Sequence, residues 1–348
     1  MPDNQTIHDN SNTFDELMGG VDFSRTYGAD EARQYCSKIA RSHYENFKVV
    51  SWLLPREFHQ HFYNIYAYCR WADDLADEIT NHQGKYDSKN RQRSCDLLSW
   101  WRIQLMRVYE GDDVVPSSSF PFSDYKGQNI PTQDAPLHPV MIALSETIDQ
   151  FSIPQEPFLD LLRAFEQDQQ KREYETYEEL LNYCRCSANP VGRLVLCLFG
   201  VRDPVSVYHS DCVCTGLQLA NFWQDVYRDF CRGRIYLPRE DRALFGYTDD
   251  QLQRKDYNEA FRKLMQFEVE RTHRWFLKGY ELVDRVPWKV QIDTEMFIRA
   301  GVRILEKIEK IDFDLWTQRP VLTRSDKAMC MVRSVGQFLW KRSFGKIV

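Results

Sequence analysis

The sequence predicts an all-α protein, because helical periodicity runs through most of the chain and turn-forming residues are few. Of the 348 residues, only 15 are Gly and 14 are Pro. Apolar residues recur every three or four positions over long stretches, as they do on one face of a helix. No internal repeat and no alternation of strands with helices is visible, which argues against a β-sandwich and an α/β fold. The 43% of hydrophobic residues suffices for one large domain or two ordinary ones.

The predicted elements begin after a polar, acidic leader over residues 1–30, and the folded domain covers residues 31–345. A strong helix begins at Pro55, because proline suits the first helical turn, and its apolar stripe runs to Ile79. Residues 110–137 are rich in Gly, Pro, Ser and Asp, which predicts a long loop or insertion. Helices are expected at about 31–45, 55–79, 91–109, 138–151, 155–170, 176–186, 190–200, 205–231, 249–284, 289–311 and 324–342.

Composition and charge argue against several classes of protein. The net charge is −6 without a long run of like charge, so no nucleic-acid partner is predicted. No run of about 18 apolar residues could span a membrane, and the polar N-terminus does not resemble a signal peptide. Among the ten cysteines, the pairs Cys184/Cys186 and Cys212/Cys214 point to different sides of a helix, which suits reduced, buried thiols better than a metal site. These features predict a cytoplasmic protein.

The first candidate site is the acidic segment Arg70-Trp-Ala-Asp73-Asp74-Leu-Ala-Asp77. Asp73 and Asp77 are four residues apart and therefore share one helix face, with Arg70 about one turn earlier. Two carboxylates on one face repel each other unless a cation bridges them, and Mg²⁺ takes one or two carboxylates together with phosphate oxygens. Taken alone, the segment is also explained by a solvated acidic turn near the end of a helix.

The second candidate site is a polar stripe on an otherwise apolar helix. Its members step by three, four and four residues along one helix face: Gln218, Asn221, Asp225 and Asp229. Because apolar residues flank them, these groups suit a wet, lined cavity better than a solvated face. Facing helices that carry both acidic motifs could hold two or three cations between them. Arginine suits bidentate phosphate contact, and Arg232 and Arg234 follow the stripe directly, although each also suits a surface ion pair.

A third feature is the segment Tyr183-Cys-Arg-Cys-Ser-Ala-Asn-Pro190. Pro190 stands inside a helical pattern, where proline kinks or breaks a helix. Such a break lets backbone carbonyls and a tyrosine point into a cavity. An ordinary turn between two helices is the alternative interpretation.

Together these segments resemble the squalene and phytoene synthase family, the head-to-head isoprenoid synthases. Both acidic motifs, the tyrosine segment and the segment Gly233-Arg-Ile-Tyr-Leu-Pro238 occur in family order, over roughly residues 40–330 outside the loop at 110–137. The resemblance implies a single-domain isoprenoid synthase fold with a central active-site cavity between helices. It also implies a lipophilic prenyl diphosphate substrate.

The resemblance also assigns roles to individual residues. Two or three Mg²⁺ ions are expected, and their implied ligands are Asp73, Asp77, Asp225 and Asp229. Tyr183 matches the family's active-site tyrosine, which is thought to handle a proton or steady a carbocation. Binding of the diphosphate is expected from Arg70, Gln218, Asn221, Arg234, Arg319 and Lys327. Arg228 is added to these residues because its positive charge could neutralise the departing diphosphate.

Departures from the family pattern narrow the predicted reaction. Members that condense two diphosphates usually carry hydroxyl residues where this chain has Glu45-Asn46-Phe47, and Glu45 would repel a diphosphate. Ala76 and Arg228 stand where acids are usual, and Gly301 stands where many members have a tyrosine. The chain therefore looks most like the hydroxysqualene synthase branch of the hopanoid pathway, which acts on presqualene diphosphate.

In that branch the diphosphate leaves, the resulting cation rearranges, and a water captures it. The aromatic faces of Trp71, Phe222 and Trp223 are expected to steady the cation. No Gly-x-Gly-x-x-Gly segment is present, and nicotinamide is not predicted as a cofactor. Two alternatives stay open: a condensing synthase that makes presqualene diphosphate, squalene or phytoene, and a non-catalytic helical scaffold. Other enzymes of the squalene and hopanoid pathways are the expected partners.

The C-terminal stretch from Phe338 to Phe344 is basic and aromatic, and it has two interpretations. It rests peripherally on an anionic surface at the inner face of the membrane, or it is a last core helix. Cations near the C-terminus of a core helix are explained by the helix dipole. The sequence leaves both interpretations open.

Overall fold

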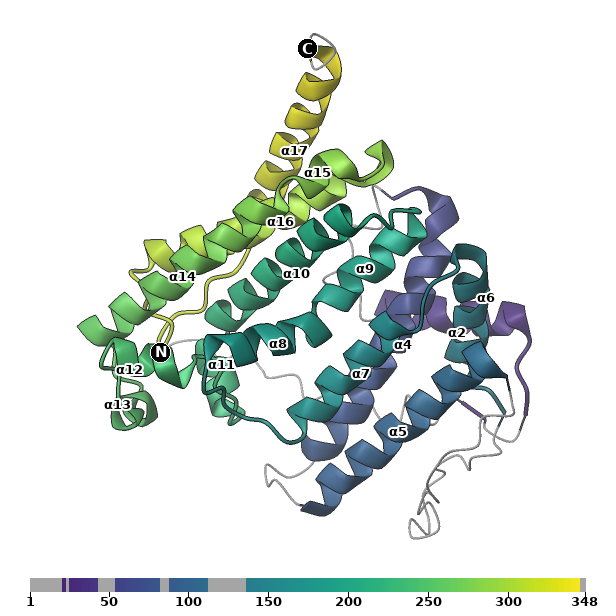
Figure 1. The fold of residues 1–348 in the computed structure, drawn as a ribbon, viewed down its shortest axis with the longest axis horizontal. Coiled ribbons are helices and arrows are strands. Elements are labelled where there is room, and N and C mark those ends of the chain that lie inside the picture. Colours follow the sequence, from purple (N-terminus) through teal and green to yellow (C-terminus); the bar gives the residue numbers. More distant parts are fainter. Residues whose placement is uncertain (1–20, 23–24, 43–53, 82–87, 112–135, 345–348) are drawn as a thin grey trace. The chain divides into compact units, whose positions relative to one another are not determined.

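The structure is a computed structural model that describes residues 21–22, 25–42, 54–81, 88–111 and 136–344. Within these ranges the chain is helical, and the only pairing of extended backbone is an isolated parallel bridge between Glu173 and Ile235 (Figure 1). The side chains of residues 77–81, 88–90 and 344 lie outside this description. The predicted all-α fold class is confirmed.

The chain forms two compact units. The first contains residues 1–44, 59–155 and 165–169, and the second contains residues 45–58, 156–164 and 170–348. Most of the loop predicted at 110–137 lies outside the described residues, as does most of the leader predicted at 1–30. The single-domain boundaries at 31–345 stay a prediction.

The first unit has an aromatic core. Its helices are α2 (Ala29–Ser42), most of α4 (Arg56–Asn81), α5 (Ser88–Glu110), α6 (Pro139–Phe151) and the end of α7 (Glu156–Asp168). The ring of Trp71 stacks on Trp101 with centroids 5.5 Å apart and meets the edge of His138 at 4.3 Å. Trp71 is fully buried in this cluster. Core rings cover Trp71 in this structure, and its expected role in steadying a cation stays a prediction.

The second unit is built around α10 (Pro204–Gln224), which packs against α9 (Asn189–Leu198), α14 (Glu259–Gly279) and α16 (Trp288–Lys310) (Figure 1). A Cβ at Gly301 of α16 would collide with the ring of Phe276 from α14, and one at Gly216 of α10 would come 3.0 Å from the same ring. Phe276 thus fills the space that a larger side chain at Gly301 would need. The helices of this unit, besides the start of α4 and α7, are α8 (Tyr177–Ser187), α9 (Asn189–Leu198), α10 (Pro204–Gln224), α11 (Val226–Cys231), α12 (Arg239–Leu244), α13 (Asp249–Arg254), α14 (Glu259–Gly279), α15 (Leu282–Arg285), α16 (Trp288–Lys310) and α17 (Arg324–Phe344).

Several helix boundaries differ from the predicted ones. The helix expected at 205–231 is interrupted at Asp225, whose backbone departs from helical geometry at φ −108° and ψ 16°. The helix expected at 249–284 is divided, because Lys255 adopts the left-handed conformation at φ 57° and the side chain of Asn258 caps a new helix. The break expected at Pro190 is present, since α8 ends at Ser187 and Pro190 lies in the first turn of α9.

Within the described part of the chain, no helix combines the length and the apolar character needed to cross a membrane. The ten cysteines are free thiols. Burial raises the pKa of Cys69 and of Cys214 to about 12. These two thiols therefore behave as small buried hydrophobic groups.

Candidate active site

The first acidic motif forms a local ion-pair group within α4. Arg70 donates from Nη1 to Asp73 Oδ2 at 3.2 Å and from Nε to Asp74 Oδ2 at 3.0 Å. The carboxylate of Asp74 is only 2% exposed, whereas that of Asp73 is 43% exposed. Asp77 belongs to the backbone of α4, but its side chain lies outside the described residues. Asp74 is thus buried in this motif, whereas the residue spacing had predicted Asp73 and Asp77 as the cation ligands.

Ala76, one of the departures from the family pattern, is buried in the same unit. Its carbonyl accepts hydrogen bonds from Gln169 Nε2 at 3.0 Å and from Ser94 Oγ at 3.5 Å. An acid at this position would enter a desolvated site, where a carboxylate is costly without a partner. The missing acid is therefore compatible with close packing around α4.

The second acidic motif recruits a distant partner within its own unit. Arg319 donates to both oxygens of Asp225, from Nε at 2.5 Å and from Nη2 at 3.0 Å, which is the strong bidentate geometry. Gln224 holds the chain beside Arg319 by donating from Nε2 to the carbonyl of Pro320 at 2.6 Å. Arg228 is exposed, and its Nε lies 3.8 Å from Asp225 Oδ1. Two predicted residues, Asp225 and Arg319, are therefore in contact.

Asp229 lies one helical turn beyond Asp225. The backbone N–H of Asp229 donates to the carbonyl of Asp225 at 2.9 Å, so the predicted stripe continues across the interruption at Asp225. Burial raises the pKa of Asp229 to about 7, the charge of Asp225 adds to this rise, and nearby arginines led by Arg234 oppose it. Near neutral pH this carboxyl is consequently divided between its acid and its anion. A bound cation would shift it to the anion.

The chain returns past Asp229 through a tight turn. Gly233 has a φ of +71°, which a residue with a side chain rarely adopts. The N–H groups of Arg232 and Arg234 then donate to the carbonyl of Asp229 at 3.0 and 2.8 Å. This turn keeps the positive charges of both arginines near the second acidic motif, as the Gly-Arg-Ile-Tyr-Leu-Pro segment had suggested.

An aromatic wall adjoins Asp229. Tyr183 is buried, with its ring centroid 6.1 Å from Phe222 and 6.0 Å from Tyr236, and Phe222 and Tyr236 stack at 3.9 Å. Trp223 is also buried and donates from Nε1 to Thr272 Oγ1 at 2.8 Å. The predicted residues Tyr183 and Phe222 thus belong to one cluster. Tyr236 was not selected, although it lies within the recognised segment.

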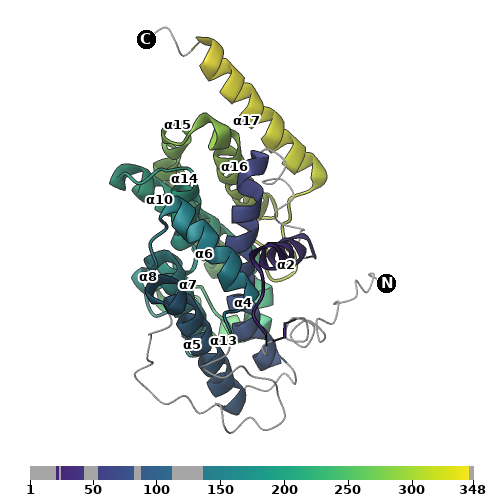
Figure 2. The ribbon, with the colours of Figure 1, turned by 90° about the vertical axis from the view of Figure 1, so that its right-hand side faces the viewer.

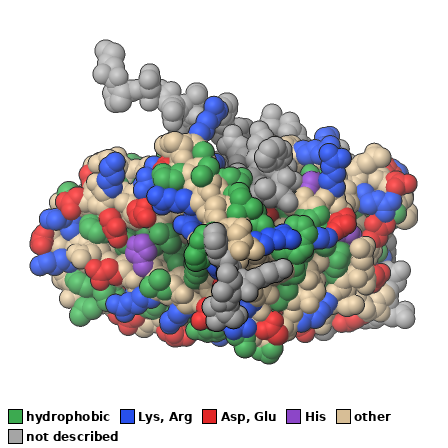
Figure 3. Space-filling model, turned by 90° about the horizontal axis from the view of Figure 1, so that it is seen from above, with side chains coloured by type: hydrophobic (Ala, Val, Ile, Leu, Met, Phe, Trp, Pro, Cys, Tyr) green, Lys and Arg blue, Asp and Glu red, His purple; other side chains and the backbone are tan. Residues whose placement is uncertain are grey.

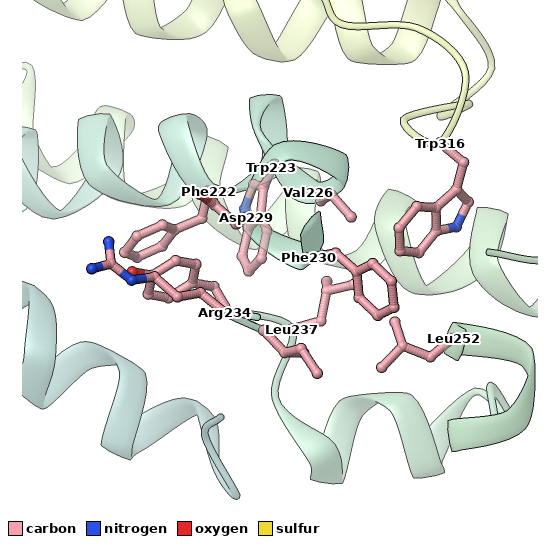
Figure 4. A pocket seen from close by; sticks show the side chains of 11 residues that line it. Phe222, Trp223, Val226, Asp229, Phe230, Arg234, Leu237, Leu252 and Trp316 are labelled. Atoms are coloured by element: carbon pink, nitrogen blue, oxygen red, sulfur yellow. The ribbon is translucent and has the colours of Figure 1, made fainter. Parts of the chain in front are cut away.

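A narrow pocket runs behind this wall (Figure 4). Its volume is about 10 Å³, enough for one water but not for a prenyl chain. Phe230, Leu252 and Trp316 form one end of it, and the guanidinium of Arg234 points away from Phe230 and Trp316 (Figure 4). This part of the wall is therefore packed protein and leaves no room for a hydrocarbon chain.

A larger pocket of about 380 Å³ follows α16. One side is apolar and includes Met296, Phe297, Ala300 and Ile304, which share a face of α16. Polar and cationic residues line the same pocket: Asn221, Gln224, Arg319 and Lys327. An apolar surface that also presents Arg and Lys suits an amphiphilic anion. Of the remaining predicted residues of this unit, Gln218 is half-buried and lines neither pocket.

Asp293 is a residue of this pocket that the sequence analysis missed. It is buried, and in the described part of the chain neither carboxylate oxygen has a hydrogen-bond partner. Burial alone raises its pKa to about 7. The available signal was an acid placed on the apolar stripe of the helix expected at 289–311. Asp293 is not part of a paired acidic motif of the kind seen at Asp225 and Asp229, so its spacing alone did not single it out.

The donor set of the second motif fits a hard cation. No three His, Cys, Asp or Glu side chains of the described ranges are grouped closely enough to form a metal site by themselves. Mg²⁺ needs just one or two carboxylates when phosphate oxygens and water complete its shell. Asp225 and Asp229 supply such oxygens one turn apart, and the raised pKa of Asp229 shows that its anion lacks full compensation. Participation of Asp73 and Asp77 stays a prediction.

Comparisons with known proteins agree with this geometry. The family model described as squalene/phytoene synthase matches residues 40–326. A phytoene synthase from Arthrospira platensis is 26% identical over 314 residues, which cover 86% of this chain and 91% of that protein. The crystal structure of squalene synthase HpnC from Alicyclobacillus acidocaldarius has 34% identity and a TM-score of 0.69, covering 85% of this chain and 98% of that one. A dehydrosqualene synthase in complex with ligand has the same TM-score at 23% identity, covering 89% and 98%, and supports the fold alone.

Proposed function

Because this chain belongs to the squalene/phytoene synthase family, whose members process prenyl diphosphates head to head, we propose that it converts presqualene diphosphate to hydroxysqualene. The observation that carries the proposal is the group of Asp225, Asp229 and Arg319 in the second unit, where Arg319 also lines the apolar pocket along α16. The 34% identity to squalene synthase HpnC supports this branch of the family.

Substrate binding follows from the pocket along α16. Arg319 and Lys327 are suited to a diphosphate, because Arg offers a planar fork and Lys a compact charge. Lys327 is exposed, and no carboxylate in the described ranges forms an ion pair with it. Asn221 lines the same pocket and offers a neutral hydrogen-bonding group. The apolar face of α16 would accept a hydrocarbon chain.

Loss of the diphosphate is the chemical step that these charges assist. A bound Mg²⁺, held by Asp225 and Asp229, would polarise the leaving diphosphate. Arg319 would exchange part of its contact with Asp225 for the diphosphate, while Arg234 and Arg228 add positive charge near the second acidic motif. Fixed cations of this kind stabilise charge that develops on a leaving group. Arg228 is exposed beside Asp225 at a position where the resemblance leads one to expect an acid, which suits a single diphosphate.

The aromatic wall suits the carbocation that remains. Phe222, Tyr236 and Tyr183 are rings in mutual contact beside Asp229, and a ring face attracts a desolvated cation by about 2 kcal/mol. Rings without strong nucleophiles also protect the cation until water captures it. The hydroxyl of Tyr183 is the group that we assign to orient this water.

A product assay tests the proposal. Purified protein receives either presqualene diphosphate or farnesyl diphosphate, with Mg²⁺ and without a nicotinamide. The expected result is hydroxysqualene from the first substrate, no turnover of the second, and loss of both diphosphate release and product after chelation of Mg²⁺. Consumption of farnesyl diphosphate would instead establish the condensing reaction, which the similarity to phytoene synthase favours. An Asp225→Asn variant with unchanged turnover would remove the acidic motif from the mechanism.

A further inference from the structure

Asp293 on α16 is an acid in an unusual environment. Acidic side chains ordinarily lie at the protein surface, and Figure 3 shows Asp and Glu there beside Lys and Arg. Asp293 is instead only 5% exposed, and in the described part of the chain neither of its carboxylate oxygens has a hydrogen-bond partner. A buried polar group without a partner destabilises the folded chain. We therefore look for its role in the binding of a ligand.

Asp293 stands at the beginning of the apolar face of α16 that lines the pocket of about 380 Å³. The residues that follow it on this face are spaced by three or four positions, as one side of a helix requires: Met296, Phe297, Ala300 and Ile304. Because an α-helix rises 1.5 Å per residue, Asp293 and Ile304 are about 16 Å apart along the helix. The acid therefore marks one end of this apolar face.

The cationic groups of the pocket lie at the opposite end of that face. Lys327 follows Asp326, which pairs with Lys307 Nζ at 2.6 Å and with Arg303 Nε at 2.8 Å in the C-terminal third of α16. Arg319 reaches the same pocket from the segment that precedes α17. The C-terminal half of α17 then extends beyond α16 in both ribbon views (Figures 1 and 2). The pocket is therefore cationic at one end and has the buried acid at the other.

This distribution determines the direction in which a prenyl diphosphate would lie. Arg319 and Lys327 attract the diphosphate, and the apolar face attracts the hydrocarbon, so the chain points towards Asp293. A chain long enough to cover the carboxyl would exclude water from a group that no donor of the described residues compensates. A shorter chain ends before the acid and leaves space for water beside it. The free energy of binding therefore depends on chain length through this side chain.

We propose that Asp293 limits the length of the prenyl chain that this pocket accepts, because its carboxyl makes the far end of the apolar face unfavourable for hydrocarbon. The inference rests on the function proposed above, since it concerns the same pocket and the same class of substrate. A farnesyl chain is the length that the pocket should accept, and a geranylgeranyl chain, one isoprene unit longer, is the length that it should exclude. The carboxyl is polar both as acid and as anion, so this limit holds in either protonation state.

Binding of two non-cleavable ligands to the full chain tests this limit. Bisphosphonates that carry a farnesyl or a geranylgeranyl chain are titrated by calorimetry with Mg²⁺ present, and the ratio of their dissociation constants is compared between variants. We expect the parent chain to bind the farnesyl ligand about tenfold more tightly. Asp293→Leu, which is similar in size but apolar, should reduce this preference to about threefold or less by improving binding of the longer ligand. Asp293→Asn is the matched control, because its amide is polar and should preserve the preference.

Two outcomes would overturn the proposal. An unchanged preference in Asp293→Leu would mean that another part of the pocket limits chain length. An equal loss of preference in Asp293→Asn would mean that polarity at this position does not exclude the longer chain. Thermal unfolding checks that both variants fold, and Asp293→Leu should be at least as stable as the parent because it removes a buried acid without a partner. The titration measures binding and not turnover, so its result is separate from that of the product assay.

Discussion

The two acidic motifs look alike in the sequence but have different surroundings. In the first, Arg70 neutralises Asp73 and Asp74 from within the same helix, three and four residues away. In the second, Asp225 takes its partner from Arg319, 94 positions along the chain, and Asp229 is left with a pKa of about 7. The carboxylates of the first motif are therefore paired by local spacing, whereas Asp229 of the second motif stays only partly compensated in a half-buried setting.

This difference indicates where the chemistry is concentrated. An exposed ion pair such as Arg70–Asp73 contributes little, because water screens it. A carboxyl whose pKa is raised by burial and by a second carboxylate is typical of functional sites. The comparison also separates two kinds of acid in one motif, since Asp74 is buried and paired while Asp73 remains accessible.

The largest effect should come from removing a carboxylate of the second motif. Asp229→Asn is expected to lower the rate of diphosphate release about 1000-fold, or about 4 kcal/mol, because the leaving group loses a ligand of its cation. Asp73→Asn should lower it only about tenfold, since Arg70 already compensates this charge. Single-turnover release of diphosphate from presqualene diphosphate measures both. If both variants lost the same factor in the rate of diphosphate release, the two acidic motifs would contribute equally to this step.

An intermediate effect is expected from the two arginines beside Asp225. Arg319→Gln should raise the KM for the diphosphate about 30-fold, or about 2 kcal/mol, because a bidentate, partly buried guanidinium is lost. Arg228→Gln is the matched variant on the same carboxylate, and its exposed side chain at 3.8 Å should change the KM less than threefold. Arg319→Lys should recover only part of the loss, because Lys lacks the planar fork. If Arg228→Gln proves the more damaging, the diphosphate lies on the other side of Asp225.

The smallest effect concerns stability, and its sign should differ between the motifs. The folded-state pKa of Asp229 is about 7, above its ordinary value of 3.8, so the folded chain binds a proton more tightly than the unfolded chain does. Stability should therefore fall as pH rises from about 4 to about 7. Asp229→Asn should remove this loss and stabilise the metal-free chain by about 1–2 kcal/mol at pH 8.

The matched variant in the first motif should act in the opposite direction. Asp74→Asn leaves Arg70 without its buried partner and should destabilise the chain by about 1–2 kcal/mol. Urea unfolding of both variants and the parent at pH 5 and pH 8 measures the difference. A stabilised Asp74→Asn variant would mean that burial of this acid is not compensated by Arg70.

Some features follow from local sequence alone because their causes are local. Apolar periodicity placed the helices to within a few residues, including the break at Pro190, where a missing N–H and a ring clash act within one turn. The same short-range rule placed Arg70 beside the first acids. The helix expected at 249–284 was too long, because polar residues around Lys255 and Asn258 allow a left-handed turn and a new cap that periodicity does not register.

Other features were decided only by tertiary structure. Trp71 is an aromatic residue of the kind that binds cations, but its ring packs against Trp101 and His138 in the core. In the sequence, Asp293 is one of several acids in an amphipathic helix. Only the packing of the described residues shows that it is buried without a hydrogen-bond partner. Glu45, on which part of the substrate argument depends, lies outside the described residues and stays a prediction.

By itself, the sequence determined the helices, their order, the two acidic motifs and the family resemblance, since these depend on spacing along one chain. Only the tertiary structure decided which carboxylate is balanced and which is not. Burial and approach of distant residues set the pairing of Asp225 with Arg319 and the raised pKa of Asp229. Electrostatic energies depend on the distance between charges and on their desolvation in three dimensions. The spacing of residues along the sequence determines neither quantity.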